Sequence, residues 1–211
     1  MTFLHESVLD LDVRHVRTDQ EWTFLNGIPA GLTTVATGGG TATTVDSANT
    51  AGPALALNIA SATDAVELRG PLIGRNVVKA VMLSVEGATN APASSKPPVW
   101  GIGLYPMTGY ASYAEIAHAA ATRSSLSMQN GGPKTTVHIM SGVALNAKDY
   151  DLGLLVDYTV PRAVAHVGHQ YGQVTTNAPA ADLYVKIRAT GGVGFETFTV
   201  YLRKVTLTIW S

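Results

Sequence analysis

The 211-residue sequence contains no cysteine, which excludes disulfide bonds, thiol catalysis and cysteine-ligated metal sites. Charge is also scarce, since charged residues make up 14% of the chain, against about a quarter for an average domain. The net charge is −1 and no basic run is present, whereas nucleic-acid binding requires a positive patch that neutralises phosphates. We therefore expect no nucleic-acid partner. So little charge suits a protein that packs among neighbours, although a monomer covered by Thr, Ser and Gly is the alternative.

Long apolar runs are missing as well. No segment approaches the ~20 apolar residues that a membrane-spanning helix needs. The chain also does not open with a cationic region followed by an apolar one, as a secretory signal peptide would. We expect a protein that is made in a cytoplasm, does not insert into a membrane and is not secreted by the signal-peptide route, but that can still leave the cell inside a particle.

What the sequence has instead is threonine, with 24 residues, together with short apolar–polar alternations. Thr favours strands and provides a polar surface without charge. The strongest alternation lies between residues 195 and 210, where apolar residues recur at Val200 and Leu202 and again from Val205 to Ile209. The phase slips by one residue at Arg203–Lys204, which predicts a β-bulge at that point.

Similar runs recur along the chain, separated by Gly, Pro, Asn and Ser, and no repeat of 20–50 residues is visible. About twelve short strands separated by turn signals predict a sandwich or barrel rather than alternating strands and helices. The segment 37–53 contains three consecutive glycines and is expected to be flexible, while 164–171 is expected to be one strand. The i, i+3, i+4, i+7 spacing within Ala111–Ala121 allows one short helix.

The first 21 residues hold seven of the 29 charged residues of the chain. Leucine and valine alternate with charged residues here, which indicates either an edge strand or an arm that docks on a neighbouring subunit. We assign 1–21 to this segment and 22–211 to the sandwich domain. Alternation also places Trp210 opposite Ile209, so that its side chain faces outward near the chain end. The predicted subunit interface of a homo-oligomer, a trimer or a ring, consists of Leu9, Leu11, Val13 and Trp210.

Motifs for catalysis or metal binding do not stand out. The Gly-x-Ser-x-Gly elbow and the phosphate-binding glycine-rich loop are both missing. Asp149 and Asp151 share one side of an extended chain and could reach one cation, but a solvated turn is the favoured interpretation. His166 and His169 would point to opposite faces of a strand. We therefore predict no catalytic residue, no metal site, no cofactor and no enzymatic activity.

Aromatic side chains are the remaining candidates for ligand binding, because sugar sites stack rings on Trp or Tyr and add a few polar groups. The candidates lie in or near strand-like segments with glycines close by. In the alternative interpretation, the three Trp residues of the chain anchor the core or an interface. The predicted ligand-binding residues are Trp100, Tyr105, His169 and Tyr171.

The segment from Ala54 to Leu72, followed by the run from Asn76 to Glu86, resembles concanavalin A-like jelly-roll domains, and the resemblance extends over 22–211. It implies an all-β, antiparallel jelly-roll β-sandwich with at most one short helix, whose terminal strand pairs back near the first. The Ala-, Thr-, Gly- and Val-rich composition also resembles virion proteins of phages that infect actinobacteria, whose minor tail proteins often carry such sandwiches. Legume-lectin metal ligands and the Glu-x-Asp-x-x-Glu motif of sandwich glucanases are absent, so no lectin or catalytic residue carries over.

These observations predict a structural protein of a phage virion, as a minor tail or tail-tip component with an adhesion-type sandwich. Its expected partners are other virion proteins and a glycan of the host cell surface. Two alternatives stay open. One is a capsid decoration protein, and the other is a carbohydrate-binding module or glycoside hydrolase with an unrecognised acid pair.

Overall fold

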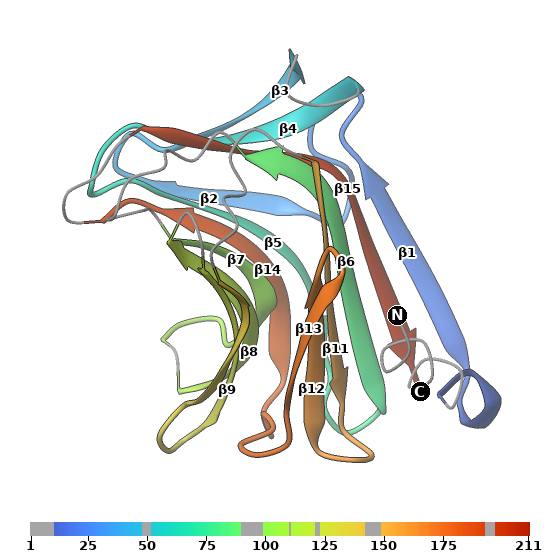
Figure 1. Ribbon diagram of the computed structural model, residues 1–211. Helices are drawn as coiled ribbons and strands as arrows, with labels where there is room; N and C mark the ends of the chain where they lie inside the picture. The colour runs from blue at the N-terminus through green and yellow to red at the C-terminus, as the bar shows by residue number, and fades with distance from the viewer. Residues whose placement is uncertain are drawn as a thin grey trace.

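The computed structural model describes residues 11–47, 52–89, 99–109, 111–120, 123–141, 149–192 and 197–211, which form two antiparallel β-sheets facing each other (Figure 1). The predicted all-β sandwich is confirmed. The first sheet has the order β13 (Gln170–Val174), β12 (Arg162–Val167), β11 (Asp149–Asp157), β6 (Ala80–Thr89), β15 (Phe198–Trp210), β4 (Gly52–Ile59) and β3 (Thr41–Ser47), and β1 (Arg17–Thr23) also pairs with β15. The second sheet has the order β10 (Thr135–Ser141), β9 (Arg123–Asn130), β8 (Ser112–Ala120), β7 (Val99–Tyr105), β14 (Leu183–Thr190), β5 (Ala65–Ile73) and β2 (Thr33–Thr37).

The core lies between the two sheets and is built by period-two alternation. On β14, Val185 and Ile187 are buried in the inter-sheet cluster, while Lys186 and Arg188 between and beyond them face the other way. Each strand thus contributes one apolar face, and burial of these faces is the main favourable term for folding. The same alternation leaves the second face of each sheet free to carry polar groups.

The bulge predicted near the end of the chain is confirmed. The register of β15 against β6 shifts between Leu202 and Lys204, so Arg203 is the extra residue. On its other side, β15 pairs with β4 up to Leu202 and with β1 from Lys204 onward. Since a bulge increases the local twist of a strand, it allows one long strand to change partners at this point.

The short helix allowed within Ala111–Ala121 is wrong, because this segment contains strand β8. Ala114 and Ile116 are fully buried in the core, and β8 pairs with β7 on one side and with β9 on the other. Pairing on both edges and burial of one face outweigh the high helix propensity of alanine, because that preference is worth less than about 1 kcal/mol per residue. Within the described chain, the helical residues are 11–14, near the N-terminal end.

Two loop expectations are also corrected. The segment 41–47 within the supposedly flexible stretch is strand β3, which pairs with β4. The segment 164–171 is a hairpin rather than one strand, because Gly168 adopts φ +56° between β12 and β13. A left-handed φ is readily available only to glycine, which makes this residue the turning point.

The N-terminal segment is an edge strand from Arg17 onward, since β1 pairs antiparallel with β15. The boundary expected after residue 21 therefore lies inside a strand. No helix in the described part of the chain is long and apolar enough to cross a membrane.

Candidate functional site

The outer face of the second sheet is concave, because β7, β8, β9 and β14 curve with their hollow side away from the first sheet (Figure 1). Strand pairing brings polar side chains into a row across this face: Lys186 lies between Arg69 and Gly103, and Gly103 is paired with Glu115. A Cβ atom at Gly103 would lie 2.3 Å from the carbonyl oxygen of Ala114. Glycine is therefore required for the close approach of β7 to β8.

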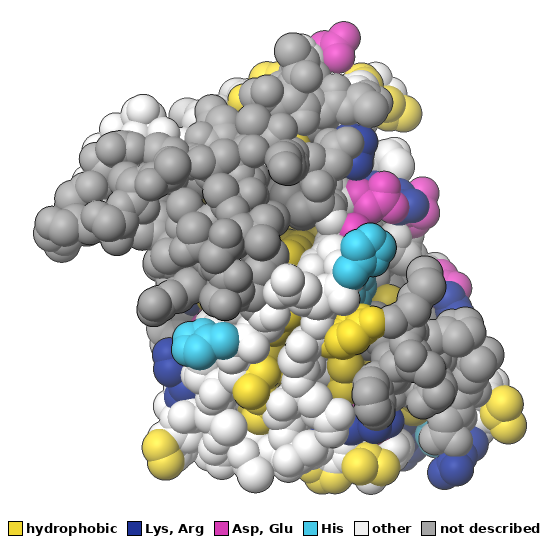
Figure 2. Space-filling model, viewed as in Figure 1, with side chains coloured by type: hydrophobic (Ala, Val, Ile, Leu, Met, Phe, Trp, Pro, Cys, Tyr) yellow, Lys and Arg dark blue, Asp and Glu magenta, His cyan; other side chains and the backbone are white. Residues whose placement is uncertain are grey.

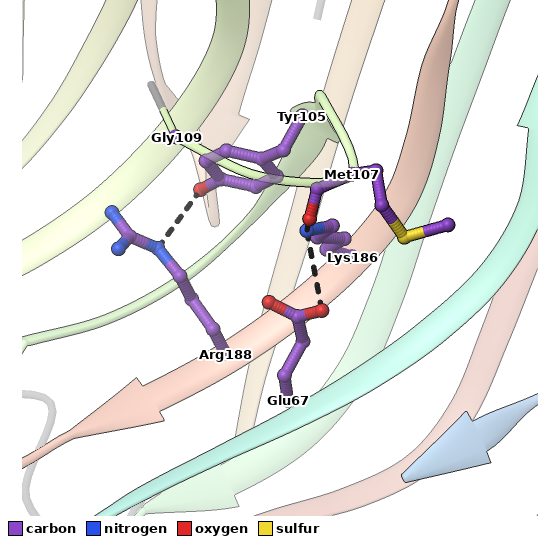
Figure 3. A pocket seen from close by; sticks show the side chains of 6 residues that line it. All are labelled: Glu67, Tyr105, Met107, Gly109, Lys186 and Arg188. Atoms are coloured by element: carbon purple, nitrogen blue, oxygen red, sulfur yellow. Dashed lines mark hydrogen bonds and ion pairs between the residues drawn. The ribbon is translucent and has the colours of Figure 1, made fainter. Parts of the chain in front are cut away.

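A cavity of about 100 Å³ opens on this face (Figure 3). Its walls come from β5, β7, β14 and the loop that follows β7. Figure 3 shows the lysine, arginine and glutamate side chains rising from their strands toward the loop backbone. The lining residues are Glu67, Tyr105, Met107, Gly109, Lys186 and Arg188.

One side of the cavity is held by Lys186 and Arg69. The Lys186 ammonium donates to the Met107 carbonyl oxygen at 3.2 Å and pairs with a Glu67 carboxylate oxygen at 3.2 Å. Arg69 donates to the same carboxylate oxygen at 2.7 Å and to the Met107 sulfur at 3.1 Å. These contacts fix the loop after β7 over the sheet and direct one carboxylate, with two cations beside it, toward the cavity.

The other side is held by Tyr105, Glu115 and Arg188. The Tyr105 hydroxyl donates to Glu115 at 2.7 Å, while Arg188 donates to Glu115 at 2.8 Å and to the Tyr105 oxygen at 3.3 Å. Burial, together with the Glu115 charge, raises the pKa of Tyr105 well above its usual value. Burial also raises the pKa of Tyr113, whose ring stacks on Tyr105 at 6.0 Å, to about 12. Tyr105 therefore remains a protonated donor at physiological pH.

The site thus combines three cations with two carboxylates. Both carboxylates, Glu67 and Glu115, already accept hydrogen bonds from cations of the same face. Such an arrangement offers fixed donors and acceptors to a polar ligand, with little freedom to reorganise. Within the described residues, no group of three or more His, Asp or Glu could hold a metal ion.

The four predicted ligand residues do not come together. Trp100 is 2% exposed and packs in the inter-sheet core, so the expectation that it stacks on a ligand is corrected. Tyr105 lines the cavity, although its ring is buried. His169 and Tyr171 lie on the β12–β13 hairpin of the first sheet, where Tyr171 is 41% exposed. Aromatic identity alone could not distinguish core from surface.

The predicted subunit interface is corrected at Trp210. Ile209 packs against the inter-sheet core and Trp210 lies on the opposite face, as alternation predicts, but its ring is 0% exposed. Leu11 covers the ring, and Asp12 accepts a hydrogen bond from its indole nitrogen at 2.7 Å. Leu11 is therefore buried in its own chain, Val13 is exposed, and Leu9 lies outside the described residues.

The residues considered for metal binding lie on β11 and on the β12–β13 hairpin. Asp151 is exposed on β11, and its strand partner on β6 is Glu86. Asp149 belongs to the same strand, but its side chain lies outside the described part. His166 is on β12, where its Nδ1–H donates to the carbonyl oxygen of Gly168 at 3.3 Å, while His169 follows in the turn.

Sequence reasoning missed the charged residues of the cavity. Lys186 and Arg188 occupy the outward positions of the clear alternation in β14, and Glu67 occupies an outward position in β5. In so charge-poor a chain, three charges on outward positions of sheet strands were an available signal. Glu115 could not be assigned to an outward strand position, because the residue spacing of its segment also fits a helix.

No protein-family model matches this sequence, and no curated protein matches it either. Solved structures do match. Peanut lectin superposes with a TM-score of 0.65 at 6% identity, over 92% of this chain and 97% of the lectin chain. The Bacillus licheniformis β-glucanase gives 0.63 at 12% identity, over 90% and 97% of the two chains.

A third match is a carbohydrate esterase of the Shiga toxin-encoding bacteriophage phi24B. It has a TM-score of 0.57 at 14% identity, over 84% of this chain and 90% of that chain. Identities this low show the fold and nothing finer. With two facing antiparallel sheets and these structural neighbours, the chain has the concanavalin A-like jelly-roll fold.

Proposed function

We propose that this protein is a glycan-binding β-sandwich module without enzymatic activity, and that the cavity on the concave face forms part of its binding site. The observation that carries the proposal is the fixed set of hydrogen-bonding groups around the cavity, namely Glu67, Lys186 and Arg188. Sugar hydroxyls both donate and accept, so they suit a carboxylate flanked by cations. The names of three structural neighbours, a lectin, a glucanase and a carbohydrate esterase, support the same ligand class.

The size of the cavity limits what enters it. Its volume of about 100 Å³ is below the roughly 300 Å³ at which small-molecule pockets begin. One edge or one substituent of a sugar ring fits, and the rest of the glycan lies along the concave face. Met107, which is 48% exposed above the cavity, offers an apolar contact to a ring.

Binding is favoured over hydrolysis by the state of the two carboxylates. Glycoside cleavage uses one carboxyl group to deliver a proton and a second as base or nucleophile. Here Glu67 is bonded to Arg69 and Lys186, and Glu115 is bonded to Arg188 and Tyr105. Such pairs are suited to hold a ligand in one orientation. Release of sugar from a bound glycan by the pure protein would favour the hydrolase alternative.

The proposed setting is a phage particle, with the module as a minor tail or tail-tip component. The low charge of the chain supports it, and Figure 2 shows the described surface in this view as mostly uncharged, with a few Lys, Arg, Asp and Glu side chains. The phage esterase with the same fold supports it as well. Mass spectrometry of separated heads and tails should detect the protein in tails; detection in heads alone would favour the capsid decoration protein.

The binding site is tested with a glycan array, followed by titration of any glycan that binds. Glu67→Gln removes the charge but keeps the shape, and should weaken binding about tenfold or more, because a hydrogen bond to a charged group contributes about 1.5–3 kcal/mol. Glu86→Gln is the matched control, since Glu86 pairs with Lys204 at 2.9 Å but faces outward from the first sheet.

Tyr171→Ala should also leave binding unchanged, because Tyr171 lies on the other sheet. A glycan whose affinity falls with Tyr171→Ala but not with Glu67→Gln would place the site on the first sheet. Absence of binding across a broad array would contradict the proposed function itself.

A further inference from the structure

Strand β2 is an edge without the usual protection. It ends the second sheet, where it pairs with β5, and no partner on its other side is present among the described strands. All five of its residues are exposed. Natural edge strands are normally shielded by charged side chains, by proline or by a covering segment. The sequence of β2, Thr-Thr-Val-Ala-Thr, contains neither charge nor proline.

The other edges of the described sheets differ from β2. The edge strand β1 carries Arg17, Asp19 and Glu21. The edge strand β3 carries Asp46. The strands β10 and β13, at the far edges of the two sheets, pack against each other. Among these edge strands, β2 therefore differs in having no charged residue while all five of its residues are exposed.

We propose that β2 pairs antiparallel with β2 of a second copy of this chain, so that the second sheets of two copies form one continuous sheet across a two-fold axis. Pairing centred on Val35 sets Thr33 of each copy opposite Thr37 of the other, and the two Val35 side chains meet at the axis. No like charges oppose each other in this register. Thr–Thr and β-branched cross-strand pairs are favourable, and a strand that complements itself suits a two-fold contact.

The charge of the whole chain agrees with self-association. With a net charge of −1 and few charged residues, two copies approach with little electrostatic repulsion. The inference concerns assembly and does not depend on the proposed glycan site. It has a consequence for that site, because β2 adjoins β5, and a continuous sheet would carry two concave faces and bind a repeated ligand with higher avidity.

The test is the molar mass of the pure protein, measured by size-exclusion chromatography with light scattering and by sedimentation equilibrium. The wild-type protein should form a dimer that dissociates on dilution. Val35→Lys places two like charges at the axis and should raise the dimer dissociation constant by about tenfold or more. Val77→Lys is the matched control, because Val77 is 67% exposed in the connection from β5 to β6 and should have no effect.

A second arm tests the register directly. An equimolar mixture of Val35→Lys and Val35→Glu chains should form a heterodimer, although neither variant dimerises well alone. Circular dichroism and the melting temperature should show both variants folded, since Val35 is 42% exposed. A monomeric wild-type protein, a dimer unaffected by Val35→Lys, or equal weakening by Val77→Lys would each overturn the proposal, whatever the glycan array shows.

Discussion

Leu11 and Val13 lie two residues apart and have opposite environments. Leu11 is 2% exposed and packs with Ala80, Leu155 and Trp210, whereas Val13 is 86% exposed. Both belong to the helical turn at 11–14, where two positions are separated by about 200° of rotation. On the strand expected from the alternation, they would have shared one face. The turn instead uses one residue to cover the outward Trp of the last strand.

Truncation of these two side chains separates their roles. Leu11→Ala should lower the free energy of unfolding by about 2–4 kcal/mol, because it leaves a cavity over Trp210. Val13→Ala, an equivalent change on the exposed side, should alter it by about 0.5 kcal/mol or less. Chemical denaturation followed by Trp fluorescence measures both values. Equal effects of the two substitutions would show that the turn does not cover Trp210 in solution.

At the scale of elements, the sequence predicted strands well where one face is strictly buried. The bulge in β15 follows from a phase slip that is visible in the sequence. β8 was not predicted, because its alanines fit a helical spacing as well as a strand. Only its pairing with β7 and β9 decides between them. A segment of nine residues gains more from two hydrogen-bonded neighbours than from local propensity.

At the scale of the whole molecule, Asp64 joins three points where the chain passes from one sheet to the other. Its carboxylate accepts hydrogen bonds from Gly39 between β2 and β3, and from Ala60 and Ser61 between β4 and β5. Its carbonyl accepts from Gly191, which follows β14. One buried residue, through its carboxylate and its backbone carbonyl, thus holds together the end of the sandwich where the sheets exchange strands.

These hydrogen bonds predict a dependence of stability on pH. The Ser61 hydroxyl, followed by the Gly39 and Ala60 amides, holds the pKa of Asp64 below its usual range. A carboxylate whose pKa is lowered in the folded state stabilises the protein at pH values above the pKa of the unfolded state, which is near 4. This stabilisation is lost as the pH falls through the pKa of the folded state. Asp64→Asn should therefore lower the melting temperature near pH 7 and have a smaller effect near pH 3. Thermal melts monitored by circular dichroism between pH 3 and pH 7 measure the difference in melting temperature between the variant and the wild-type protein. An equal difference at pH 3 and at pH 7 would contradict the role of the Asp64 charge.

The sequence by itself determined the all-β class, the bulge and the outward direction of Trp210, because alternation and turn residues act over a few neighbouring positions. It did not determine which outward residues are covered or which of them meet. The cavity joins Glu67 to Lys186 across more than one hundred residues, and Trp210 is buried by residues from the opposite end of the chain. Strand pairing decides both contacts, and pairing depends on how all the apolar faces are buried together rather than on any local pattern.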